Sequence, residues 1–189
     1  MVLAVMDPLL VEVFVPLDDQ FARLLDLLEE TGQRENTVII LTTDHGETMG
    51  DHGLLEKGCR FYEGLVRVPL VFSWPGHLKQ DLRSNALVEL LDMTPTVLEL
   101  TGLDVPEYVQ GKSLLPILKG EASPDFHRES VRSEYFDAVF LEKTREPVGQ
   151  FGHVYSKASA RPDPESYPDG IGTFATMYRT DRHKLVVYH

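Results

Sequence analysis

Two residues of metal-binding type, Asp44 and His45, stand side by side directly after an apolar, β-rich run over residues 38–42. A carboxylate and an imidazole are both metal ligands, and Gly46 after them lets the backbone turn sharply, so both side chains can face one ion. Ligands of open α/β sheets bind beyond the carboxyl ends of the strands, which is where this pair falls. The pair is a candidate half of a metal site, although a helix-capping Asp44 and a surface His45 also explain the dipeptide.

Three further side chains are candidates for the same site. Lys57 follows thirteen positions after Asp44, and a loop of that length can fold back, so that the ammonium holds an anionic oxygen beside the metal. His52, between two glycines, could line the site or be hydrogen-bonded within its own loop. Arg67 stands just before a Val-Pro strand start, a position that favours a structural ion pair.

The elements that must position these residues are short strands and an amphipathic helix. The run over 38–42 is continuous and too brief for a helix, as expected of a parallel strand covered on both faces, and residues 70–74 form a second such run. Residues 17–31 have helical spacing of leucines and end at Gly32. Helix, strand, site loop and strand together predict a parallel α/β unit.

Downstream, the pattern predicts a helix over 87–100 in which Pro95 starts a new turn, then a loop and a short helix within 103–120. The charged segment 121–129 is expected to leave His127 exposed. A strand is expected within 131–141, a long surface loop or partly disordered insertion over 142–172, and a hairpin formed by 173–178 and 184–188.

Several of these motifs, in this order and spacing, resemble the downstream metal motif of the sulfatases, within the alkaline-phosphatase-like superfamily. The matching residues lie in Thr43-Asp44-His45-Gly46-Glu47, Gly50-Asp51-His52-Gly53, Lys57, Tyr62-Glu63, Arg67-Val68-Pro69 and Trp74-Pro75-Gly76. The resemblance implies an α/β fold, a partial alkaline-phosphatase-like parallel sheet with flanking helices. It places the C-terminal part of that domain in residues 1–130 and the start of a small antiparallel C-terminal subdomain in 131–189, with both ends of the chain cut.

Carried over residue by residue, the resemblance implies that Asp44 and His45 bind a divalent cation, usually calcium. Lys57 would bind the sulfate and act in catalysis, with His52 as a second catalytic candidate. The implied reaction is hydrolysis of a sulfate ester, and the implied partner is a small-molecule or glycan sulfate ester. A hard cation beside an ammonium suits this chemistry, since both stabilise negative charge that develops in the transition state.

The family's nucleophile is absent from these 189 residues. Sulfatases attack with a formylglycine made from the Cys or Ser of a Cys/Ser-x-Pro-x-Arg pattern, whereas Cys59 is followed by Arg60-Phe61 and the Ser73-Trp74-Pro75-Gly76 run ends in His77. The chain alone is therefore expected to be inactive. Two alternatives stay open: a phosphodiester or phosphonate ester hydrolase of the same superfamily, and a non-catalytic remnant that acts by interaction.

Composition excludes several other classes of function. The chain has a net charge of −12, from 18 basic and 30 acidic residues, which argues against binding nucleic acid or an anionic membrane surface. No run reaches membrane-spanning length, and the single cysteine excludes an intrachain disulfide. A parallel sheet deprived of its upstream strands would expose an edge, which predicts self-association. The compartment cannot be predicted from the sequence.

Overall fold

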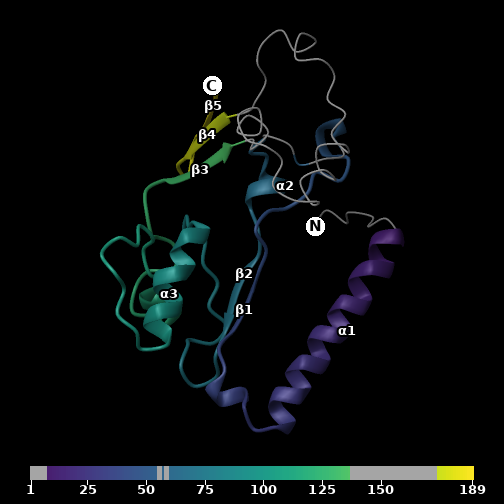
Figure 1. Ribbon diagram of the computed structural model, residues 1–189, viewed down its shortest axis with the longest axis vertical. Helices are drawn as coiled ribbons and strands as arrows, with labels where there is room; N and C mark the ends of the chain where they lie inside the picture. The colour runs from purple at the N-terminus through teal and green to yellow at the C-terminus, as the bar shows by residue number, and fades with distance from the viewer. Residues whose placement is uncertain (1–7, 55–56, 58–59, 137–173) are drawn as a thin grey trace, which may run out of the picture.

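The computed structural model describes residues 8–54, 57, 60–136 and 174–189, with side chains for residues 16–54, 57, 60–135 and 175–189. The helices are α1 (Pro8–Glu30), α2 (Glu63–Val66), α3 (Met93–Leu100) and α4 (Leu115–Leu118), and single 3-10 turns lie at η1 (Arg34–Asn36), η2 (Asp51–Gly53) and η3 (Leu90–Asp92). The strands are β1 (Ile39–Thr42), β2 (Leu70–Ser73), β3 (Val131–Phe136), β4 (Phe174–Arg179) and β5 (Lys184–Tyr188). Figure 1 shows a central β1–β2 ribbon, with α1 and α3 on opposite sides of it.

The two strands that flank the site loop pair antiparallel, so the prediction that they form a parallel unit is wrong for this pair. Ile39 lies opposite Ser73, and Thr42 lies opposite Leu70. The physical reason is how the connection folds: the Gly46 N–H donates to the Leu65 carbonyl oxygen at 2.8 Å, so the connection begins and ends at the same end of the ribbon, whereas a parallel partner needs a crossover to the opposite end. The chain therefore re-enters the ribbon at the end where it left, and the site loop sits at that end.

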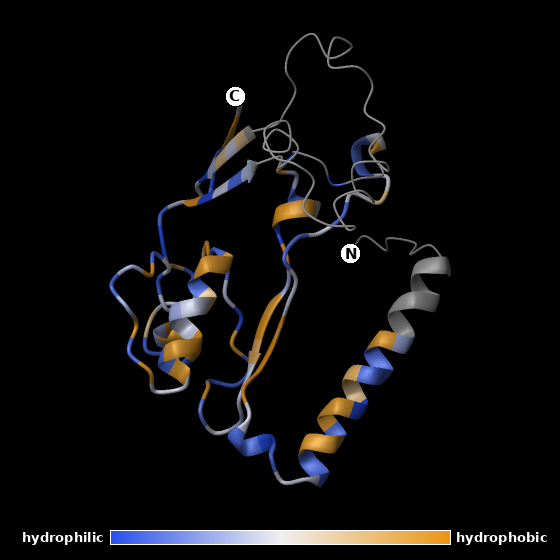
Figure 2. Ribbon diagram, viewed as in Figure 1, coloured by the Kyte–Doolittle hydropathy of each residue, from blue (hydrophilic) through white to orange (hydrophobic). Residues whose placement is uncertain are grey.

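Helix α1 begins earlier than predicted, at Pro8 rather than at Leu17, and it contains Pro16. It ends where the pattern placed the stop, since Gly32 adopts a positive φ of 65°. Its apolar side chains remain largely open to solvent: Leu17 is 63% exposed and Leu27 is 52% exposed. Figure 2 shows this apolar stripe alternating with polar residues along the helix. In the described part of the chain, no helix has the length and apolarity needed to cross a membrane.

The β1–β2 ribbon also carries an exposed apolar pair. Leu41 and Val71 are directly opposite each other and are 46% and 51% exposed. Among the described residues each strand has one neighbour, the other strand of the ribbon. An open edge beside apolar side chains is a surface on which another strand can pair, which is the basis of the predicted self-association.

A buried carboxylate, Asp92, organises the segment around α3. Asp92 Oδ1 accepts hydrogen bonds from the Lys112 backbone N–H at 2.8 Å and from Arg128 Nη2, and Asp92 Oδ2 accepts from the Glu89 backbone N–H at 2.9 Å. His127 Nε2 lies 3.4 Å from Asp92 Oδ2. The prediction that His127 is exposed is wrong, because its side chain is 3% exposed and is held against this carboxylate.

The helix predicted over 87–100 is confirmed from Met93 to Leu100, and Pro95 falls in its first turn, where the missing N–H costs nothing. The predicted short helix is α4. The loop before it packs tightly, since a Cβ on Gly111 would lie 2.1 Å from the Leu91 carbonyl oxygen, and only glycine fits there.

The C-terminal residues form a three-stranded antiparallel sheet in the order β3-β4-β5. The predicted hairpin is confirmed, with Arg179 opposite Lys184 at its turn. The strand predicted over 131–141 is described from Val131 to Phe136. Outside the described residues lie the rest of that strand, the predicted loop 142–172 and Cys59. One face of the sheet packs on the site loop through a cluster of four buried residues: Phe61, Val131, Ala175 and Met177.

Candidate functional site

Asp44 and His45 leave β1 with their side chains turned toward each other. The distance from His45 Nε2 to Asp44 Oδ2 is 3.5 Å. The other carboxylate oxygen, Oδ1, accepts hydrogen bonds from the His45 backbone N–H at 3.0 Å and from the Thr43 hydroxyl at 3.2 Å. One oxygen is thus fixed by its own loop, and Oδ2 is the oxygen that faces His45.

The hydrogen bonds of His45 define its tautomer. Nδ1 lies 2.8 Å from the Gly46 carbonyl oxygen, which can only accept, so Nδ1 carries the proton. Nε2 therefore presents a lone pair, and the Lys57 ammonium donates to it at 3.0 Å. Lys57 thus lies where the sequence predicted: the loop folds back and brings the ammonium to the imidazole. An imidazole nitrogen held in this way is in the form that binds metal ions.

The surroundings of the Asp44 carboxylate stabilise its ionised form. Its hydrogen bond from the His45 backbone N–H, and then the one from the Thr43 hydroxyl, hold the pKa of Asp44 below its usual value. The side chain is 82% exposed. Asp44 is therefore ionised at neutral pH and open to a ligand from solvent.

Gly46 brings the site against the one-turn helix α2. Its N–H donates to the Leu65 carbonyl oxygen at 2.8 Å. A Cβ on Gly46 would lie 1.8 Å from the Gly64 carbonyl oxygen. The glycine allows the two backbones to touch, and this contact places the end of the lysine-bearing loop beside His45.

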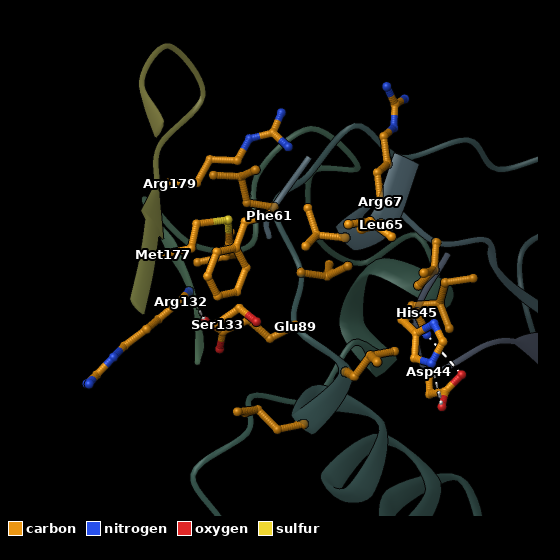
Figure 3. A pocket seen from close by; sticks show the side chains of 18 of the residues that line it. Asp44, His45, Phe61, Leu65, Arg67, Glu89, Arg132, Ser133, Met177 and Arg179 are labelled. Atoms are coloured by element: carbon orange, nitrogen blue, oxygen red, sulfur yellow. Dashed lines mark hydrogen bonds and ion pairs between the residues drawn. The ribbon is translucent and has the colours of Figure 1, made fainter. Parts of the chain in front are cut away.

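Asp44 and His45 open into a cavity of about 1320 Å³ that is lined by α2, β2, the segment 84–91, α4 and the strands β3 and β4. Figure 3 shows Asp44 and His45 on one side of this cavity and Phe61 and Met177 on the other. Lys57 and Arg67 also line it. Arg67 was predicted to form an ion pair, but it is exposed and no carboxylate of the described residues pairs with it; in Figure 3 its guanidinium points away from His45.

His52 lies apart from the other candidates. Its ring stacks on Tyr62 with 4.0 Å between centroids and 17° between planes, and it adopts a positive φ of 57°. It lines a smaller cavity of about 470 Å³, together with Tyr62 and Lys184. The structure does not bring His52 to the Asp44 carboxylate.

The donor set fits one side of a cation site. Two ligand atoms that each lie about 2.3–2.6 Å from a shared Ca²⁺ stand roughly 3–3.5 Å apart, which matches the separation of Asp44 Oδ2 and His45 Nε2. Within the described ranges, no three His, Cys, Asp or Glu side chains gather as a metal-binding group. The pair can hold one face of a cation, and calcium's remaining oxygen ligands must come from elsewhere.

Glu63, for which no role was predicted from the sequence, forms a central contact between α2 and the C-terminal sheet. Its carboxylate binds Arg179 and Lys184 of the C-terminal hairpin. The sequence contained a signal for this contact. Arg179 and Lys184 stand on either side of the predicted β4–β5 turn, where two like charges lie side by side and an anion between them is stabilising.

Comparison with known proteins agrees with the motifs. A family model described as sulfatase matches residues 15–103. The chain is 37% identical over 122 residues to an N-acetylglucosamine-6-O-sulfatase of Bacteroides thetaiotaomicron, covering 64% of this chain and 22% of that protein. It is 37% identical over 134 residues to a multifunctional alkaline phosphatase superfamily protein of Trinickia caryophylli, covering 70% of this chain and 26% of that protein. The chain thus spans about a quarter of the length of these curated relatives.

Solved structures share the fold. A phosphonate monoester hydrolase from Silicibacter pomeroyi superposes with a TM-score of 0.68 at 30% identity, over 90% of this chain and 30% of that chain. A protein solved in complex with its substrate D-glucosamine-2-N,6-O-disulfate gives a TM-score of 0.68 at 26% identity, over 93% of this chain and 30% of that chain. Sequence and fold therefore lead to one conclusion: the chain belongs to the sulfatase family and carries part of a domain with the alkaline-phosphatase-like fold.

Proposed function

We propose that this chain supplies part of the active site of a sulfuric ester hydrolase. The observation that carries the proposal is the arrangement at the end of β1, where His45 Nε2 lies 3.5 Å from Asp44 Oδ2 and accepts a hydrogen bond from Lys57 Nζ at 3.0 Å. A carboxylate, an imidazole lone pair and an ammonium meet at one point. Such a point can bind a cation and a tetrahedral anion together.

In this proposal Asp44 and His45 hold a divalent cation, calcium, on one side of the cavity. The cation, when bound, would neutralise the charge of a sulfate group and polarise its oxygens. Lys57 then turns from His45 Nε2 to a sulfate oxygen, which it binds as a point charge. Gly46 and α2 keep the ends of the loop in place, so the ammonium stays close to the cation.

The substrate class we propose is a sulfated sugar. Two similar proteins support it: one is named an N-acetylglucosamine-6-O-sulfatase and the other was solved with a disulfated glucosamine. The attacking group would come from outside these 189 residues, because no Cys/Ser-x-Pro-x-Arg pattern occurs in them. We therefore expect the 189-residue chain by itself to bind calcium and sulfate without turning over an ester.

Self-association through the open β1–β2 edge is part of the same proposal. Sedimentation velocity at rising protein concentration tests it. A sedimentation coefficient that stays at the monomer value at every concentration excludes self-association.

Replacing Lys57 with Met is expected to weaken binding of inorganic sulfate about tenfold in the presence of calcium. The reason is that a charge-assisted hydrogen bond contributes about 1.5–3 kcal/mol. Isothermal titration of sulfate into the calcium-loaded chain measures the effect. The exposed Lys119→Met is the matched control, because it removes the same charge outside the cavity. Equal sulfate affinity in Lys57→Met and Lys119→Met would contradict the proposal.

A second candidate, hydrolysis of a phosphonate ester, is favoured by the similarity in fold and sequence to a phosphonate monoester hydrolase. Sulfate and phosphonate share a tetrahedral shape, and Lys57 binds either. We expect the complete protein that contains this chain to hydrolyse an aryl sulfate with a higher kcat/KM than the matching aryl phosphonate. Steady-state rates on the two esters decide between the candidates, and the reverse order would assign the phosphonate reaction.

A further inference from the structure

Two cations face each other across the β4–β5 hairpin. Arg179 and Lys184 are direct cross-strand partners, and like charges in that position destabilise a sheet. The Glu63 carboxylate lies between them. Arg179 Nη1 donates to both of its oxygens, at 2.9 and 2.7 Å, and Lys184 Nζ donates to Oε1. Lys184 first, and then Arg179, lowers the pKa of Glu63, so the carboxylate stays charged and neutralises the pair.

The same hairpin holds the residue at the start of this segment. Lys184 Nζ also donates to the Phe61 carbonyl oxygen at 2.8 Å. The Phe61 ring is 7% exposed and packs against Met177 of β4. The C-terminal sheet therefore binds residues 61 and 63. These residues connect the loop that bears Lys57 to α2.

A short chain of contacts connects α2 to the candidate metal ligand. The Leu65 carbonyl oxygen accepts from the Gly46 N–H at 2.8 Å, and the Gly46 carbonyl oxygen accepts from His45 Nδ1 at 2.8 Å. The position of the Gly46 peptide sets the direction of the imidazole. Displacement of α2 would therefore turn His45 as well as free the loop of Lys57.

We propose that Glu63 is a positioning residue that docks the β4–β5 hairpin on α2 and thereby orients His45 and Lys57. The proposal rests on the proposed function for what those two side chains bind. It gives the C-terminal sheet a role at the site, because the β4–β5 hairpin and α2, which are 116 or more positions apart in the chain, meet at one carboxylate. Glu63 acts through α2 and Gly46, and it touches no substrate.

Hydrogen–deuterium exchange of the 189-residue chain tests this role in Glu63→Gln. We expect exchange at the Gly46 N–H to be about fivefold faster, because α2 loses its charged anchor. Exchange at the Leu114 N–H, which is bonded to Thr96 Oγ1 at 2.8 Å, should not change. Sulfate affinity in the presence of calcium should fall about fivefold. Adding Arg179→Met to Glu63→Gln should add little to the exchange rate at Gly46, because both hydrogen bonds of the Arg179 guanidinium go to Glu63.

The matched control is Asp181→Asn, which removes a carboxylate from the exposed hairpin turn and should leave the Gly46 exchange rate unchanged. If Glu63→Gln is unfolded, so that all of its backbone amides exchange fast, Lys184→Met alone serves as the test. In that variant Arg179 still binds the Glu63 carboxylate. Unchanged exchange at Gly46, or faster exchange with unchanged sulfate affinity, overturns the positioning role. If Glu63→Gln speeds exchange at Gly46 but the wild-type chain binds no sulfate, the docking contact is supported. The proposed function is then contradicted.

Discussion

Replacing Asp92 with Ala is expected to lower the free energy of unfolding by about 3–5 kcal/mol, the range seen when one partner of a buried ion pair is removed. Asp92 has no solvent-exposed surface. Its loss leaves the backbone N–H groups of Glu89 and Lys112 without their acceptor and removes one of the two carboxylates that bind Arg128. Urea denaturation followed by circular dichroism measures the change.

The matched control is Asp125→Ala. Asp125 is exposed and accepts a single long hydrogen bond, at 3.3 Å, from Asn85, so its removal should change stability by less than about 0.5 kcal/mol. If Asp92→Ala does not fold, Asp92→Asn keeps the volume and two acceptor lone pairs and gives a measurable midpoint. A loss below 1 kcal/mol in Asp92→Asn together with a folded Asp92→Ala would show that the carboxylate is not the organising contact of this segment.

Gly46→Ala is expected to cost about 3 kcal/mol of stability, the upper end of the usual overpacking penalty, and to abolish measurable sulfate binding. The added Cβ would meet the Gly64 carbonyl oxygen at 1.8 Å. Both sides of that contact are backbone, so no flexible side chain can move aside. The chain must separate α2 from the end of β1, which breaks the Gly46 to Leu65 hydrogen bond and moves Lys57 away from His45.

Gly64→Ala is the matched control on the other side of the same contact. A Cβ on Gly64 would meet Asp51 Oδ2 and the Glu47 carbonyl oxygen at 3.7 Å, an ordinary van der Waals distance. Because Gly64 lies inside α2, alanine there is expected to be neutral or stabilising by about 0.5–1 kcal/mol. Thermal unfolding and sulfate titration of both variants provide the comparison. Equal stability and sulfate affinity in Gly46→Ala and Gly64→Ala would mean that the close approach has no role.

Sequence reasoning succeeded where the signal is local. The helical spacing and the glycine stop of α1, the first-turn proline of α3 and the turn between β4 and β5 each depend on a few neighbouring residues. The prediction that Asp44 and His45 lie just past the end of a strand is confirmed, since β1 ends at Thr42, and their metal-binding role stays a prediction. The return of Lys57 was predicted from loop length and motif order, and the structure places its ammonium 3.0 Å from His45 Nε2.

The prediction was wrong, or gave no answer, where distant segments decide. The direction of β2 depends on how residues 43–69 return to the ribbon, and the continuous apolar runs that favoured a parallel pair occur here in two antiparallel strands. The burial of His127 depends on Asp92, thirty-five positions earlier in the chain. A charged segment is normally exposed, but the buried Asp92 carboxylate, the last residue of η3, binds Arg128 and lies against His127, which favours their burial.

The amino-acid sequence by itself determined the family and the candidate residues Asp44, His45 and Lys57, because these depend on residue type and on short spacing. Tertiary structure alone decided how they are held. Glu63 meets Arg179 across 116 positions of the chain, and Gly46 touches Gly64 backbone to backbone. No local preference specifies such contacts. They form because packing of Phe61 against the C-terminal sheet brings the segments together, and charge and shape then select the partners.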